Sequence, residues 1–257
     1  MLIAIDAGHY LGTPGKRCLK SIDPWETREW VLNSRAADKV QKRLTAYDCQ
    51  TMRVDDVTGQ KEVTLYERVR AANLAGADVY LSIHHNAGIN GGSGGGIVVY
   101  VCPGVGEDTT SLQRAVYEHT VASTGLRGNR SQPLGVAEFY VLENTTMPAV
   151  LGEFGFMDST TDTPIILTEE YSERLADGIV SALVEACDLK EVETVTYEQW
   201  KGFMERYKQE QGQLLPSDWA EEGLLKAKER GITDGTRPQS EATRQEVALM
   251  INAALRG

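Results

Sequence analysis

Short apolar runs that end in polar residues recur along most of the chain. Three of them are Leu2–Asp6, Val79–Ile83 and Ala149–Glu153. Each is rich in β-branched residues or leucine and is followed by glycine or a polar turn, which predicts a buried strand. The same pattern predicts further strands near Gln50–Val54, Gly96–Val101 and Glu138–Val141.

Segments with helical periodicity separate these runs. Within Glu29–Leu44, apolar residues recur at every fourth position from Leu32 onward, which predicts an amphipathic helix. Similar patterns predict helices over Thr64–Ala75, Leu112–Ser123 and Thr168–Ala186. Strands that alternate with helices indicate an α/β fold with a mostly parallel, twisted sheet of about six strands flanked by helices.

The pattern changes near Asp188. Residues Leu189–Thr196 have no clear period and are typical of a linker, and three short helical patterns follow. We therefore expect a domain over 1–187, a linker over 188–196 and a small all-α domain over 197–257. The last is close to the lower size limit for independent folding.

Composition excludes some partners. The formal net charge is −11, so the chain should bind neither nucleic acid nor an anionic membrane surface. Its four cysteines form no C-x-x-C pair and are expected to be reduced thiols. The N-terminus shows no signal-peptide pattern, and no apolar run is long enough to cross a bilayer, so we expect synthesis in the cytoplasm.

Candidate metal ligands stand at the ends of the predicted strands. The carboxyl ends of parallel strands meet at one edge of a sheet, which should bring His9, His84 and Glu153 together. A catalytic zinc ion takes three protein ligands and keeps a position for water, whose pKa it lowers to about 7. Glu29 is our choice for the third ligand and Glu26 is its rival. Glu153 is then placed to act as the general base.

Simpler interpretations exist for the same residues. Glu29 would suit a helix N-terminus because of the helix dipole, and Glu153 could be a solvated strand end. Successive residues of a strand face opposite sides, so only one of His84 and His85 should bind the metal. We interpret His85 and Asn86 as candidate substrate contacts.

Four motifs in order give the chain a family resemblance. They are Asp6–His9, Arg28–Asn33, Ser82–Ala87 and Met147–Phe156. Over residues 1–187 the chain resembles the zinc-dependent N-acetylmuramoyl-L-alanine amidases of the Amidase_3 family. The resemblance implies zinc held by His9, Glu29 and His84, with Glu153 as the catalytic glutamate. It also implies peptidoglycan as substrate, cleaved between N-acetylmuramic acid and the L-alanine of the stem peptide.

The tail resembles a single S-layer homology repeat. The matching segments are Trp219–Ala220, Gly231–Gly235 and Ala242–Ala248. The resemblance implies binding of a cell-wall polymer, and a homodimer could compensate for having one copy. The alternative is a small helical domain that only packs on the amidase.

The arrangement of a catalytic domain and a tail, without a visible signal peptide, favours a phage or prophage endolysin of a Gram-positive host. Such an enzyme acts at the cell wall after release by a partner such as a holin. A bacterial autolysin exported by another route is an alternative. Two other classes stay open, a zinc peptidase that cleaves wall peptides and a non-catalytic wall-binding protein.

Overall fold

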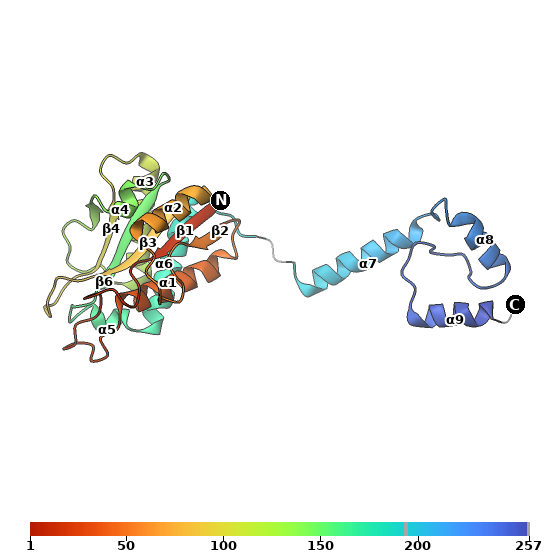
Figure 1. Ribbon diagram of the computed structural model, residues 1–257, viewed down its shortest axis with the longest axis horizontal. Coiled ribbons are helices and arrows are strands. Elements are labelled where there is room, and N and C mark those ends of the chain that lie inside the picture. Colours follow the sequence, from red (N-terminus) through yellow and green to blue (C-terminus); the bar gives the residue numbers. More distant parts are fainter. Residues whose placement is uncertain (193–194, 256–257) are drawn as a thin grey trace. The chain divides into compact units, whose positions relative to one another are not determined.

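The computed structural model describes residues 1–192 and 195–255, which form parts of two compact units, Met1–Val192 and Glu193–Gly257 (Figure 1). The strands of the first unit are β1 (Leu2–Ala7), β2 (Gln50–Arg53), β3 (Val79–Asn86), β4 (Ile97–Val101), β5 (Leu134–Val136) and β6 (Ala149–Phe156). Its helices are α1 (Glu29–Leu44), α2 (Leu65–Ala75), α3 (Glu107–Thr124), α4 (Tyr140–Glu143), α5 (Thr163–Ile166) and α6 (Glu169–Cys187).

The six strands form one sheet in the order β2-β1-β3-β6-β4-β5. Neighbouring strands are parallel except for β4 and β6, which are antiparallel. The predicted α/β fold with a mostly parallel sheet is therefore confirmed. The carboxyl ends of β1, β3 and β6 lie at the same edge, where open α/β sheets bind ligands.

Helices cover both faces of the sheet (Figure 1). On one face, Ile5, Leu81 and Phe154 belong to a core that α1, α3 and α6 complete. On the other face, Tyr80 and Leu151 pack with α2 and α4 in a smaller core. Alternate residues of each strand supply the two cores, so the apolar runs in the sequence are nearly continuous.

Local signals explain where most helices begin and end. Helix α1 has the predicted bounds. Helix α2 begins after Thr64, which forms a capping box with Glu67, and it ends at Gly76 in a left-handed conformation. Helix α3 starts at Glu107, before the predicted Leu112 by more than one turn, and has two acidic residues in its first turn.

The strand expected at Glu138–Val141 is wrong. Strand β5 lies earlier, at Leu134–Val136, and the segment that follows it forms the helical turn α4. A helical turn buries the adjacent side chains of Val141 and Leu142 together in the smaller core, which a strand cannot do because neighbours alternate between faces.

The second unit contains α7 (Tyr197–Gln213), α8 (Glu221–Glu229) and α9 (Arg244–Ala254), which confirms an all-α C-terminal part. Capping boxes open α7 at Thr196 and α9 at Thr243. None of the residues of these three helices is buried. In the described ranges, no helix is both long enough and apolar enough to span a membrane.

Candidate metal centre

His9, Glu29 and His84 meet at the carboxyl edge of the sheet. Each offers a ligand atom, and these atoms lie within 4.8 Å of one another. The Nδ1 atom of His84 lies 3.0 Å from Oε1 of Glu29, and Nε2 of His9 lies 3.3 Å from Oε2 of the same carboxylate. The two imidazole rings stand nearly perpendicular, with centroids 5.0 Å apart. The structure thus joins residues that are far apart in sequence.

The backbone around each residue accounts for this convergence. His9 follows β1 with a φ of 69°, a left-handed conformation that side-chain-bearing residues rarely adopt and that is common at functional sites. The preceding residue is Gly8, and a Cβ atom at this position would overlap the His84 ring. Glu29 is the first residue of α1, and its N–H donates to the carbonyl of Lys16 at 3.0 Å.

A buried arginine holds the loop that carries His9. The Arg68 guanidinium donates from Nη2 to the His9 carbonyl and from Nη1 to the Ala7 carbonyl, both at 2.8 Å. It also pairs with the buried carboxylate of Asp6. Burial alone would raise the pKa of Asp6, but the charge of Arg68 lowers it, so the carboxylate stays ionised. Helix α2 therefore fixes the end of β1.

Asn33 supports the same loop from α1. Its Nδ2 donates to the Gly8 carbonyl at 3.0 Å, and its Oδ1 lies 2.8 Å from Nδ1 of His85. Asn33 belongs to one of the motifs that carry the family resemblance, whereas Arg68 was not among the candidate residues. Periodicity gave no signal for Arg68, because it predicts that the apolar residues of its helix face the sheet. The contacts of Arg68 become visible only in the folded structure.

Glu153 lies beside this cluster on the neighbouring strand. It pairs in register with His84, so the two side chains share one face of the sheet. Burial raises the pKa of Glu153 to about 7, and the charge of Glu29 adds to that shift while the charge of His84 opposes it. A carboxyl group with such a pKa can accept and return a proton near neutrality.

The electrostatics favour an ionised Glu29 between the two imidazoles. Burial tends to raise the pKa of Glu29, but its contacts with His84 and His9 lower it well below the ordinary value. Burial likewise tends to lower the pKa of His84, and Glu29 reverses this so that the pKa is raised. Within the described ranges, the buried atoms His9 Nε2, Glu29 Oε2 and Glu153 Oε2 have no partner in hydrogen-bonding geometry, although the first two lie 3.3 Å apart.

This donor set fits zinc. Two imidazole nitrogens and one carboxylate oxygen are a common ligand set of catalytic zinc sites. Buried polar atoms without partners are rare, and a bound cation would satisfy two of those found here. Lys16, which the sequence did not single out, places Nζ 3.6 Å from Oε2 of Glu29, so a side-chain cation already approaches this carboxylate.

The structure does not bring every candidate into the cluster. Glu26, the rival of Glu29, pairs instead with Arg17 and Lys20 near the surface. His85 is only 2% exposed and faces the opposite side of the sheet, where burial lowers its pKa to about 3. Asn86 lies at the end of β3 and lines a hollow next to the cluster.

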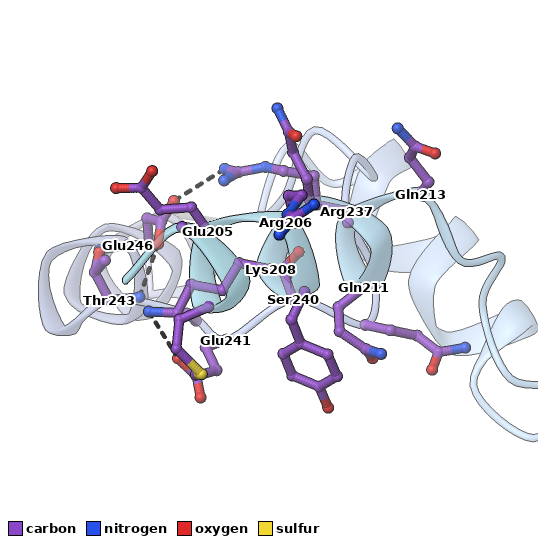
Figure 2. A pocket seen from close by; sticks show the side chains of 17 residues that line it. Glu205, Arg206, Lys208, Gln211, Gln213, Arg237, Ser240, Glu241, Thr243 and Glu246 are labelled. Atoms are coloured by element: carbon purple, nitrogen blue, oxygen red, sulfur yellow. Dashed lines mark hydrogen bonds and ion pairs between the residues drawn. The ribbon is translucent and has the colours of Figure 1, made fainter. Parts of the chain in front are cut away.

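The second unit has a hollow of its own, between α7 and the segment from Arg237 to Glu246 (Figure 2). Its volume is about 1040 Å³. Two ion pairs lie among the residues that line it, one between Lys208 and Glu241 and one between Arg237 and Glu246. It contains no cluster of histidine, cysteine or carboxylate side chains of the kind seen around His9, as far as the described residues extend.

Comparisons with known proteins agree with this geometry. Residues 3–185 match the family described as N-acetylmuramoyl-L-alanine amidase, Amidase_3. The chain is 35% identical over 140 residues to the N-acetylmuramoyl-L-alanine amidase CwlM of Bacillus licheniformis, which covers 54% of this chain and 53% of that protein. It is 28% identical over 190 residues to the endolysin of Bacillus phage SPP1, which covers 74% and 67%.

A solved structure shows the same fold. The N-acetylmuramoyl-L-alanine amidase from Clostridium difficile 630 matches with a TM-score of 0.64 and 28% identity, over 73% of this chain and 96% of that one. The chain spans about half the length of CwlM and of the sporulation-specific amidase of Bacillus subtilis.

Proposed function

The chain belongs to the Amidase_3 family of N-acetylmuramoyl-L-alanine amidases, and from this membership we propose that it is a peptidoglycan hydrolase. The bond cleaved is the amide between the lactyl group of N-acetylmuramic acid and the L-alanine of the stem peptide. The observation that carries this proposal is the convergence of His9, Glu29 and His84 beside Glu153.

We propose zinc as the cofactor, held by His9, Glu29 and His84. The donor set and the buried atoms without hydrogen-bond partners support this assignment. Bound zinc supplies a Lewis acid and lowers the pKa of a coordinated water molecule. The contacts of Arg68 and Asn33 with the carbonyls of His9 and Gly8 would keep the His9 ligand in position.

Glu153 is the proton carrier in this proposal. Its Oε2 is buried and lacks a partner among the described residues, so it can accept the proton of the attacking water. Burial holds the pKa of Glu153 at about 7, and this allows the same oxygen to return the proton to the leaving amine. The side chain would thus serve as base and then as acid.

Digestion of purified peptidoglycan tests the proposal. Mass analysis should show free muramic lactyl ends and new amino groups on L-alanine, whereas cleaved peptide bonds would indicate a zinc peptidase. We expect Glu153→Ala to retain zinc and to lose hydrolysis by about 10²–10⁴-fold, the contribution of a general base. Wild-type rates in that variant would remove Glu153 from the mechanism. Failure of the purified protein to bind zinc would favour a non-catalytic wall-binding protein.

We further propose that the C-terminal unit binds a cell-wall polymer, in keeping with its resemblance to an S-layer homology repeat. Exposed aromatic side chains support this role, since Tyr197 is 71% and Trp219 is 88% exposed. Tyr197 also stacks on Trp200, with ring centroids 6.0 Å apart. The stacked pair of Tyr197 and Trp200 offers an aromatic surface on α7 that a wall polymer could contact.

The similarity to the SPP1 endolysin supports a role as a phage or prophage lysin. In that role the protein would reach the wall only after a partner such as a holin opens the membrane. Expression in a susceptible host without any pore protein should leave cells intact, and co-expression of a holin should lyse them. Lysis without a pore protein would instead support an autolysin exported by another route.

A further inference from the structure

A hollow of about 400 Å³ is lined by residues of β3, β4 and β6 and by the loop that contains Arg130. Val98 of β4 lies directly opposite Glu153 of β6 in an antiparallel pair, so their side chains share a face. Tyr100, two residues after Val98, points to that face as well. Both residues line the hollow, together with Asn86 at the end of β3. The hollow therefore begins one strand away from the proposed proton carrier.

Arg130 supplies the positive charge of this hollow. Its guanidinium carbon lies 4.3 Å from the centroid of the Phe156 ring, which forms a buried floor at 3% exposure. The Arg130 side chain is exposed and appears in none of the ion pairs of the described residues. Stacking on an aromatic face orients a guanidinium and leaves its N–H groups free to donate.

The loop that carries Arg130 is fastened to the sheet. Asn129 donates from its backbone N–H to the Gly95 carbonyl at 3.3 Å, and its Oδ1 accepts from the Gly95 N–H at 3.0 Å. Side chains at Gly96 or Gly128 would collide with the opposing backbone, which explains the close approach of the two segments. Such anchoring reduces the entropy lost when the guanidinium binds a ligand.

The floor of the hollow shares this anchor. The Oδ2 atom of Asp162 accepts from the N–H of Phe156 at 3.0 Å and from the N–H of Gly96 at 2.7 Å. One carboxylate therefore holds both the backbone of Phe156, whose ring lies under the guanidinium, and the segment to which the Arg130 loop is bound. The remaining polar groups around the hollow are neutral, namely the amides of Asn86 and Gln132 and the hydroxyl groups of Tyr100 and Ser131.

We propose that this hollow binds a carboxylate of the stem peptide on the leaving-group side of the scissile amide, with Arg130 as the specificity-determining residue. The inference rests on the proposed amidase function. In the substrate, the lactyl carboxyl group is already an amide, so the peptide and not the sugar carries the negative charge. A guanidinium fork matches a carboxylate in a bidentate manner, and neutral amide and hydroxyl groups complete the hydrogen bonding.

Steady-state kinetics of the full chain tests this inference. Two soluble muropeptides are compared, one with free carboxylates on its acidic residues and one with those groups amidated. We expect Arg130→Gln to raise KM for the acidic substrate by about tenfold or more with little change in kcat, as for loss of a charged hydrogen bond. The amidated substrate should show a much smaller change, and Arg130→Lys should restore part of the affinity.

Arg127→Gln is the matched control, because Arg127 lies in the same loop and its side chain does not line the hollow. An unchanged KM in Arg130→Gln, or an equal rise for both substrates, would overturn the inference. So would a fall in kcat without a change in KM. If the wild-type chain releases no L-alanine amine from either substrate, the proposed function fails, and that outcome is distinct from any effect of Arg130.

Discussion

At the scale of a single residue, the backbone conformation of His9 determines where its imidazole ring points. Its left-handed conformation costs free energy. Asn33 donates to the carbonyl of Gly8 and Arg68 donates to the carbonyl of His9, and these two contacts hold the conformation in place. The result is an imidazole turned from the end of β1 toward Glu29 and His84. Strained residues cluster at functional sites, so this conformation supports the proposed role of His9 as a metal ligand.

The ligand assignment gives a direct prediction. His9→Ala should weaken zinc binding by more than about 100-fold, because even residues that only support a ligand contribute about 10–100-fold. Zinc content after dialysis against a competing chelator measures the effect. Glu26→Ala is the control, since Glu26 pairs with Arg17 and Lys20 and lies outside the cluster. Wild-type zinc content in His9→Ala would contradict the ligand assignment, and zinc loss in Glu26→Ala would contradict the choice of Glu29 over Glu26.

Arg68 gives a second prediction, on stability. Arg68→Met leaves the Asp6 carboxylate buried without its partner, and we expect a loss of about 3–5 kcal/mol in the free energy of unfolding. The double variant Asp6→Asn/Arg68→Met removes the unpaired charge and should recover part of that loss. Urea denaturation of the full chain measures both. A double variant less stable than Arg68→Met would show that the ion pair is not the source of the loss.

Strand ends made part of the site predictable from sequence. His9, His84 and Glu153 each follow an apolar run, and parallel strands bring such positions to one edge. The sequence could not decide between Glu29 and Glu26 as the third ligand, because a loop can bring either residue to the edge of the sheet. Lys16 and Arg130 gave no sequence signal, since each lies in an irregular segment whose path depends on contacts with remote residues.

At the scale of elements, ion pairs join α1 to α6 across the face of the sheet. Glu173 of α6 lies 2.5 Å from Nζ of Lys39 and 2.5 Å from Nη2 of Arg43, both on α1. Asp177 adds a contact with Arg43 at 2.6 Å. The hydrogen bonds from Arg43 and Lys39 lower the pKa of Glu173 to about 2.

The lowered pKa of Glu173 fixes the pH dependence of its contribution. A carboxyl group whose pKa falls from 4.5 to about 2 on folding stabilises the fold above pH 4.5, and this stabilisation fades as the pH falls toward 2. Glu173→Gln should therefore lower the thermal midpoint slightly at pH 7, and the difference from wild type should shrink below pH 4.5. Glu170→Gln is the control, because its partner Arg174 lies on the same helix. A difference that is constant with pH would exclude this ion-pair mechanism.

Element boundaries were predictable where local chemistry fixes them. The capping box at Thr64 and Glu67, and Gly76 after α2, depend only on nearby residues. The conformation of the segment around Val141 was not predictable in this way, because its aromatic and β-branched residues have a high propensity for strands. Contact with α2 and the smaller core decides in favour of a helical turn, and tertiary context of this kind is invisible in the local sequence.

The distribution of buried side chains separates the two units at the scale of the whole molecule. Every buried apolar residue in the described part of the chain precedes residue 193. The C-terminal unit instead exposes large apolar groups on each helix, such as Trp200, Leu225 and Leu249. A unit of this size without a buried core has little intrinsic stability, so a binding partner should contribute much of its order.

Removal of the C-terminal unit should therefore spare catalysis and impair targeting. A chain of residues 1–192 keeps the whole buried core and the cluster of His9, Glu29 and His84. We expect its unfolding midpoint and its turnover of soluble muropeptides to match those of the full chain. Its retention on purified cell walls in a sedimentation assay should fall. Equal retention of both chains would show that the C-terminal unit does not bind the wall.

Wall binding can also be distinguished from loss of folding in the tail. A ligand that binds only the folded state stabilises it by RT ln(1 + [L]/Kd). Added wall polymer should therefore raise the melting temperature of the C-terminal unit and leave that of the first unit unchanged. Trp200→Ala in the full chain removes one aromatic group that is 52% exposed and is expected to reduce that shift. A shift of the first unit alone would assign wall recognition to the catalytic face, because only the unit that holds the ligand gains stability from it.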